Sequence, residues 1–122
     1  MNIQSEIGRF LLSHGCPSNI SGYYYAKEAI AFVLASKTVG YSKNMYWHIA
    51  KQYNTETFNI ERCIRTLINK TWNAHQFTDL FTQRPSSRQF ILRCAEAMNF
   101  KLSAIENGSG TKSIIDILDT WK

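Results

Sequence analysis

The sequence predicts an all-α protein: a compact bundle of about six helices that contains a helix-turn-helix and is followed by an additional C-terminal helix. Apolar residues recur at three- and four-residue intervals in almost every segment, whereas the alternation typical of strands is hard to find. The 122 residues are 44% hydrophobic and 13% aromatic, which is enough to build one core. We therefore expect one domain over residues 1–103, followed by a hinge and an amphipathic helix over residues 104–122.

Two helices are predicted in the first third of the chain. The first covers residues 3–12 and ends at residues 14–17, where a Gly and a Pro stop a helical pattern. The second covers residues 21–36, and Gly40 closes the connection that follows it. The residues expected to be buried on these helices are Ile3, Ile7, Phe10, Leu11, Tyr23, Ala26, Ile30, Val33 and Leu34.

Three more helices are predicted in the middle of the chain, over residues 43–53, 56–74 and 87–100. Ser87 is a suitable N-cap for the last of them. A short turn of helix is expected over residues 78–81, just before the break around Pro85.

The C-terminal segment begins with the stretch expected to be the most flexible, residues 107–110, which contains two glycines. The apolar residues beyond it predict a final amphipathic helix, because they recur at helical spacing: Ile114, Ile115, Ile117, Leu118 and Trp121. Trp47 and Trp72 are expected to lie in the core of the bundle.

The spacing of residues 46–65 is typical of a helix-turn-helix. Two helical patterns are separated there only by Asn54 and Thr55. Ala50 is small enough to let the second helix cross close to the first, and Asn54 can adopt the left-handed conformation that a tight turn requires. Thr55 is expected to cap the second helix.

The outward face of the second helix has the chemistry of a DNA reader. Arg bonds guanine, Asn bonds adenine, Glu accepts from cytosine, and an aromatic ring packs on the thymine methyl group. The candidate base-contacting residues are Phe58, Asn59, Glu61, Arg62, Arg65 and Thr66. The candidate phosphate-contacting residues are Lys43, Lys51, Thr55, Lys70, Arg84 and Arg88.

The charge distribution favours a polyanionic partner for the middle of the chain. The formal net charge is +5. Residues 43–93 hold eight Lys and Arg against three Asp and Glu, so this segment carries the whole excess. A basic surface on one part of a small domain is the electrostatic signature expected of a nucleic-acid binder.

Other function classes find little support. The chain contains no H-E-x-x-H, G-x-S-x-G or P-loop pattern, so we expect neither an enzyme nor a bound cofactor. His14 and Cys16 lack a second pair of ligands, so we expect no metal site, and the three cysteines are predicted to be reduced, mostly buried thiols. Without an export signal or a long apolar run, we expect a cytoplasmic protein that does not interact with membranes.

Several motifs resemble the C-terminal DNA-binding effector domain of the stage-zero sporulation protein A family, the response regulator that commits endospore-forming bacteria to sporulation. The similarity covers about four-fifths of the chain and is strongest over residues 46–72. It implies a six-helix bundle whose fourth helix enters the major groove, with base contacts from Glu61, Arg62 and Arg65. The matching motifs are Ile7-Gly8, His14-Gly15-Cys16-Pro17, Gly22-Tyr23-Tyr24-Tyr25, Lys27-Glu28-Ala29-Ile30, Ile49-Ala50-Lys51, Asn54-Thr55, Ile60-Glu61-Arg62, Ile64-Arg65, Trp72, Pro85 and Phe90.

The resemblance also implies partners and includes one departure. Phe58-Asn59 stands where the family usually has Ser-Arg, so the family's operator is not assumed for this chain. The expected partner is double-stranded DNA, and the further candidates are a homodimer on tandem sites and RNA polymerase. Because the receiver domain that normally precedes this module is not in the chain, we expect no control by an aspartyl phosphate within it.

A protein-interaction module remains the second interpretation. Such a paralogue would keep the fold and bind the full-length regulator or RNA polymerase, and the outward Phe58 would suit that role. Affinity for arbitrary duplex that falls steeply with salt separates the two classes.

Overall fold

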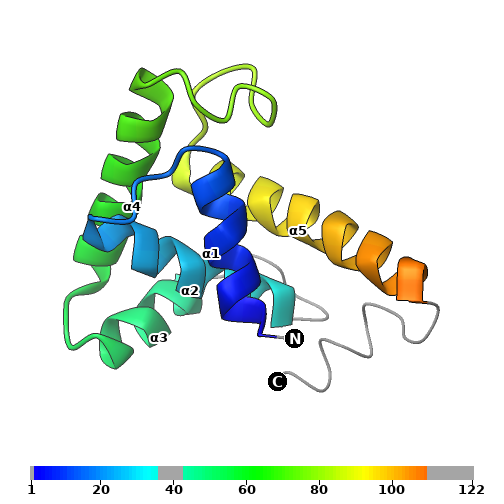
Figure 1. Cartoon of the computed structure of the whole chain (residues 1–122). Helices are drawn as coiled ribbons and strands as arrows, with labels where there is room; N and C mark the ends of the chain where they lie inside the picture. Colours follow the sequence, from blue (N-terminus) through cyan, green and yellow to red (C-terminus); the bar gives the residue numbers. More distant parts are fainter. Residues whose placement is uncertain (1, 36–42, 110–122) are drawn as a thin grey trace.

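The computed structural model describes residues 2–35 and 43–109, and in these ranges all regular structure is helical. The described helices are α1 (Ile3–Ser13), α2 (Ser21–Ala35), α3 (Lys43–Gln52), α4 (Thr57–Asn73) and α5 (Ser87–Ser109), shown in Figure 1. The predicted all-α class is confirmed.

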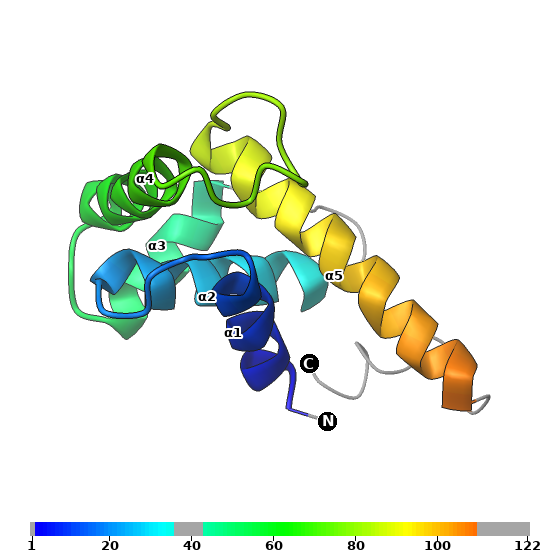
Figure 2. The same cartoon turned by 45° about the horizontal axis from the view of Figure 1, so that its top comes forward.

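Helix α2 is the centre of the bundle and packs against each of the other four helices (Figure 2). It is apolar around most of its circumference, as a helix with neighbours on several sides must be. Its buried residues are Gly22, Tyr23, Ala26, Ala29, Ile30, Ala31 and Leu34. Three of these seven are alanines, so neighbouring helices can approach its axis closely.

The predicted count of six helices is not confirmed, because residues 78–81 form a turn and not a helix. The amides of Leu80 and Phe81 both donate to the carbonyl of Phe77, and no further helical turn follows these two hydrogen bonds. Phe77 has φ 40°, outside the right-handed helical region. Its buried ring packs against the rings of Phe81 and Phe90, at centroid distances of 5.2 and 5.8 Å, which anchors the loop by tertiary contacts.

Helix α5 is longer than predicted and continues past residue 100 to Ser109. The stretch expected to be flexible therefore begins inside a helix, and so does the expected C-terminal segment. Residues 101–106 include Lys, Leu, Ala and Glu, which are good helix formers, so the sequence offers no stop signal before the glycines at 108 and 110. The predicted final helix, with Ile114 and Trp121, lies outside the described residues.

Three helices end on the same backbone motif, in which a residue with positive φ turns the chain. Gly15 follows α1, Asn54 follows α3 and His75 follows α4, with φ of 85°, 53° and 60°. In each case the next two amides after the cap donate back to the last helical carbonyls, the pattern of a Schellman motif. The left-handed conformation predicted for Asn54 is thus confirmed.

Candidate nucleic-acid interface

Helices α3 and α4 form the helix-turn-helix, joined by residues 53–56. The amide of Thr55 donates to the carbonyl of Ala50 at 2.9 Å, which closes the turn. Ala50 is buried, with 4% of its surface exposed, so the two helices do approach closely at this position. The inner side of α4, with Ile60, Ile64 and Leu67, is fully buried, and this fixes which side of the helix faces outward.

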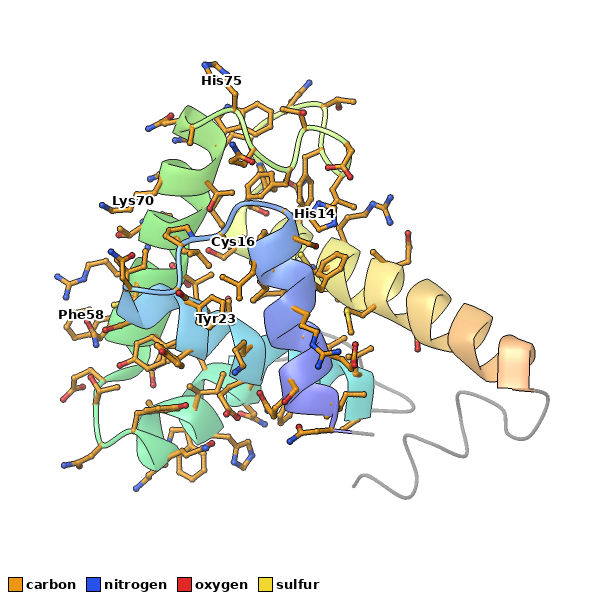
Figure 3. The ribbon with its side chains drawn as sticks, in the orientation of Figure 1. His14, Cys16, Tyr23, Phe58, Lys70 and His75 are labelled. Carbon is orange, nitrogen blue, oxygen red and sulfur yellow. The ribbon has the colours of Figure 1, made fainter. Side chains whose placement is uncertain are left out.

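The six candidate base-contacting residues come together on the outward side of α4. Phe58 is 66% exposed, and Glu61, Arg62, Arg65 and Thr66 are also exposed, whereas Asn59 is half-buried. Helix α4 runs along one edge of the molecule (Figure 1). Figure 3 shows Phe58 and Lys70 on the same outer side of α4, both pointing away from the bundle. This face of α4 is therefore accessible to a partner as large as a DNA duplex.

Hydrogen bonds organise the side chains on this face. Nη2 of Arg62 donates to Oδ1 of Asn59 at 2.7 Å, and Nδ2 of Asn59 donates to Oγ1 of Thr55 at 3.0 Å. Nη2 of Arg65 lies 2.9 Å from Oε1 of Glu61. Both arginines are therefore held along α4 by residues one turn earlier.

Thr55 does not cap α4 as predicted. The N-cap is Glu56, with extended backbone, and its side chain makes no capping hydrogen bond. Because α4 begins at Thr57, the hydroxyl of Thr55 lies one residue too early to reach a free amide of the first turn, and it accepts from Asn59 instead.

A polar hollow of about 320 Å³ lies over the turn, and Lys51 stands beside it. Nζ of Lys51 lies 5.2 Å from the centre of the Trp47 ring, within the range of a cation–π contact. Trp47 is 51% exposed, so its predicted place in the core is wrong. Residue 47 lies about 200° around α3 from the buried Ile49, which turns its ring toward solvent.

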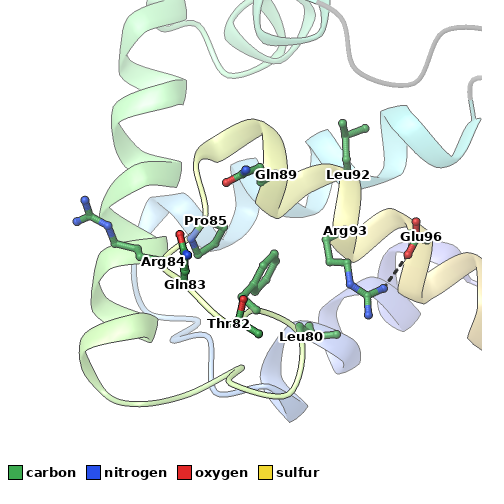
Figure 4. A pocket seen from close by; sticks show the side chains of 10 residues that line it. Leu80, Thr82, Gln83, Arg84, Pro85, Gln89, Leu92, Arg93 and Glu96 are labelled. Carbon is green, nitrogen blue, oxygen red and sulfur yellow. Dashed lines mark hydrogen bonds and ion pairs between the residues drawn. The ribbon is translucent and has the colours of Figure 1, made fainter.

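A second hollow of about 360 Å³ lies between α4 and the start of α5. Arg65 and Arg84 line it together with Asn69, and Nη1 of Arg84 donates to Oδ1 of Asn69 at 3.0 Å. Figure 4 shows the Arg84 side chain directed toward α4. Arg88 also lines this hollow, which therefore gathers three cations and one carboxylate, that of Glu61.

The start of α5 corrects one more prediction. Ser86, not Ser87, is the capping residue: its Oγ accepts from the amide of Gln89, and its own amide donates to Oε1 of Gln89. This reciprocal pair is a capping box, and the Ser-x-x-Gln spacing was the sequence signal that could have located it. Asn69, which accepts a hydrogen bond from Arg84, also lines this hollow and was in neither candidate set.

The remaining predicted phosphate contacts lie on both helices of the helix-turn-helix. Lys70 is exposed in the last turn of α4, and Lys43 is the first residue of α3. Lys70, Lys51 near the turn, and Arg84 and Arg88 across the second hollow place positive charge around the outward face of α4.

His14 and Cys16 lie in the connection between α1 and α2, away from this face. Nδ1 of His14 is 3.3 Å from Oδ1 of Asp79. Cys16 is buried beside Thr71, and this burial raises the pKa of its thiol to about 11. All three cysteines are free, with Cys94 also buried and Cys63 half-buried.

No group of three potential metal ligands occurs within the part of the chain that the structure describes. Among those same residues, no helix combines the length and apolar character that crossing a membrane requires. A third hollow, about 510 Å³, lies beside the loop before α5, and its charged groups are Arg84, Arg93 and Glu96 (Figure 4). Arg93 and Glu96 pair with each other at 2.9 Å.

The family model described as "Sporulation initiation factor Spo0A C terminal" matches residues 7–98. The match covers about three quarters of the chain, from within α1 to within α5. It includes the helix-turn-helix and all twelve candidate contact residues.

Proposed function

The chain belongs to the sporulation initiation factor Spo0A C-terminal family, a family of DNA-binding effector domains, and on this premise we propose that it is a sequence-specific transcriptional regulator. It binds double-stranded DNA in the cytoplasm and controls genes of sporulation or a related programme. Helix α4 lies in the major groove and reads base edges.

The observation that carries this proposal is the exposed face of α4. Arg62 and Arg65 lie on it one helical turn apart, on the side opposite the buried Ile60 and Ile64. Arginine has the planar pair of donors that matches the O6 and N7 atoms of guanine. An exposed helix that carries two such groups, supported by a second helix across a tight turn, is the geometry of a major-groove reader.

The cations around α4 supply the nonspecific part of the binding. Lys51 lies by the first turn of α4, and Arg84 and Arg88 lie across the second hollow. Groups on both sides of a reading helix can contact the phosphates that border the groove, which fixes the register of the protein on the duplex. Lys43, Thr55 and Lys70 complete the proposed phosphate contacts.

Two measurements on the full chain test the proposal. Affinity for arbitrary duplex at low salt is expected to be measurable and to fall linearly on a log–log plot as salt rises, because phosphate contacts release counterions. Selection from a random duplex library is expected to enrich one sequence family. Binding without salt dependence, or no enrichment at low salt, would contradict the proposal.

One observation favours a second candidate, a module that binds the full-length regulator or RNA polymerase. Phe58 is the most exposed of the large apolar residues in the described ranges, and it lies on the same face of α4. An exposed aromatic ring is a common anchor in protein interfaces. Under this alternative, Phe58→Ala would abolish binding to the protein partner, and DNA affinity would be weak with or without the substitution.

A further inference from the structure

Asn59 lies between two other polar residues of the helix-turn-helix and contacts both. Its Oδ1 atom accepts from Nη2 of Arg62 at 2.7 Å, and its Nδ2 atom donates to Oγ1 of Thr55 at 3.0 Å. Sγ of Cys63 lies 3.7 Å from the same Oδ1 atom. Asn59 is half-buried, whereas Arg62 is exposed, so the amide is the more confined member of the pair.

Hydrogen-bonding chemistry fixes which way this amide points. A guanidinium group carries only donors, so the group of Asn59 that faces Arg62 must be the carbonyl oxygen. The amino group then faces the hydroxyl of Thr55, which can accept. The reverse orientation would place an NH₂ group against the guanidinium and would lose the contact with Arg62.

This arrangement conflicts with direct reading of adenine by Asn59. That contact uses Oδ1 and Nδ2 together on one base edge. Here the two atoms are directed to different residues, so reading adenine would require both contacts to be given up. Arg62 has no such conflict, because its five N–H donors leave a free pair after one is given to Asn59.

We infer that Asn59 is a positioning residue: it holds the Arg62 guanidinium for base reading and is itself held by Thr55 at the turn. The inference rests on the proposed DNA-binding function and deepens it. A long arginine side chain loses rotational freedom on binding, and a guanidinium already oriented in the free protein loses less. Asn59 thus contributes to the preference for a guanine that Arg62 contacts, without contacting a base.

The first test uses the free protein and does not depend on DNA. The side-chain Nε–H order parameters of Arg62 and Arg65 are measured by NMR in the wild type, in Asn59→Ala and in Asn59→Asp. Asn59→Ala is expected to lower the order parameter of Arg62 and leave that of Arg65 unchanged, because Arg65 is held by Glu61. Asn59→Asp keeps an acceptor for Arg62 and is expected to preserve its order. Alanine is a good helix former, so α4 should persist in the first variant.

The second test is selection from a random duplex library with the wild type and Asn59→Ala. The variant is expected to lose guanine preference at one base pair by about three- to tenfold, because an Arg62 side chain that is no longer held must be ordered on binding. Its affinity for arbitrary duplex should be unchanged because no charge is altered. As the matched control, Arg62→Ala should lose the preference at the same base pair, and the double variant should lose little more.

Three outcomes would overturn the inference. One is an Arg62 order parameter that is equal in the wild type and Asn59→Ala. Another is loss of an adenine preference in Asn59→Ala with the guanine preference intact. The third is failure of the wild type to enrich any sequence, which overturns the proposed function as well. The first two are observed while the wild type still binds DNA, so they distinguish failure of the inference from failure of the function.

Discussion

The backbone carbonyl of Cys63 in α4 lies against Gly22 in α2, so close that a Cβ atom at position 22 would overlap its oxygen. The same Cβ atom would lie 2.9 Å from the carbonyl carbon of Cys63. At this crossing α2 therefore touches the backbone of α4 directly, on the side opposite the face that we propose reads DNA. The position of the outward face depends on this contact.

Gly22→Ala should destabilise the protein. A backbone carbonyl cannot move aside as a flexible side chain can, so α2 and α4 must separate, and such overpacking costs about 1–3 kcal/mol. Gly22 is the second residue of α2, where replacing glycine by alanine gains less than the roughly 1 kcal/mol of a helix interior, so the loss outweighs the gain. Chemical denaturation followed by circular dichroism measures the difference.

Gly8→Ala is the matched comparison for that substitution. Gly8 lies in the middle of α1, where alanine gains up to about 1 kcal/mol, and the nearest obstacle is the hydroxyl of Tyr23 at 2.8 Å, the end of a side chain that can shift. We expect Gly8→Ala to be clearly less destabilising than Gly22→Ala. Equal losses would show that the backbone contact with Cys63 has no special cost.

His75→Gly should stabilise the protein by up to about 1 kcal/mol. His75 has φ 60° in the motif that ends α4, a conformation that costs a non-glycine residue energy. Asn54→Gly is the control, because asparagine tolerates the left-handed region better and little change is expected there. Denaturant midpoints of both variants give the comparison, and a lower midpoint for His75→Gly would contradict the argument.

Lys51→Ala should weaken binding to every duplex alike. If Lys51 contacts a phosphate, the slope of log affinity against log salt should fall by about one unit. Lys27→Ala removes the same charge from a lysine that also lies over aromatic rings, those of Tyr23 and Tyr24. An equal change of slope for Lys27→Ala would point to overall charge as the cause, and not to a local contact.

Arg62→Ala and Arg65→Ala should each cost about 1–3 kcal/mol on the best selected sequence and much less on random duplex. A lost base contact penalises only the matched sequence. Arg9→Ala is the control, because Arg9, like Arg65, is an exposed helical arginine paired with a glutamate one turn earlier. Equal losses on matched and random duplexes would assign the two arginines to phosphates.

Cys16 and Cys94 should resist alkylation in the folded protein, whereas Cys63 should react more readily because it is less buried. Desolvation by burial raises the pKa of both buried thiols, so few thiolates form near neutral pH. Mass spectrometry after iodoacetamide treatment, with and without denaturant, identifies the modified residues. Rapid labelling of Cys16 in the native state would contradict its burial.

The same burial predicts a pH effect on stability. The thiol of Cys16 has pKa 9.0 in the unfolded chain and about 11 in the folded one, so the unfolded state loses its proton first. Its contribution to stability is therefore complete below pH 9 and is lost as pH rises toward 11. Thermal unfolding of Cys16→Ala and wild type over this range should show a smaller decrease for the variant.

The sequence by itself determined the helical class, the helix-turn-helix and the outward face of α4. These features depend on local patterns: helical spacing shows which residues share a face, and Asn54 suits the left-handed turn by its own conformational preference. Arg62 and Arg65 were placed correctly on that face because buried Ile60 and Ile64 define the opposite side.

Only the tertiary structure decided which residues pack against each helix face. Trp47 is about half exposed because, among the described residues, no other helix covers its side of α3. Residues 78–81 form a turn because the ring of Phe77 packs against Phe90 of α5. Gly22 touches the carbonyl of Cys63, forty-one positions away in the sequence. Packing and hydrogen-bond partners depend on residues that folding brings together from distant parts of the chain, and a local pattern carries no information about which ones they are.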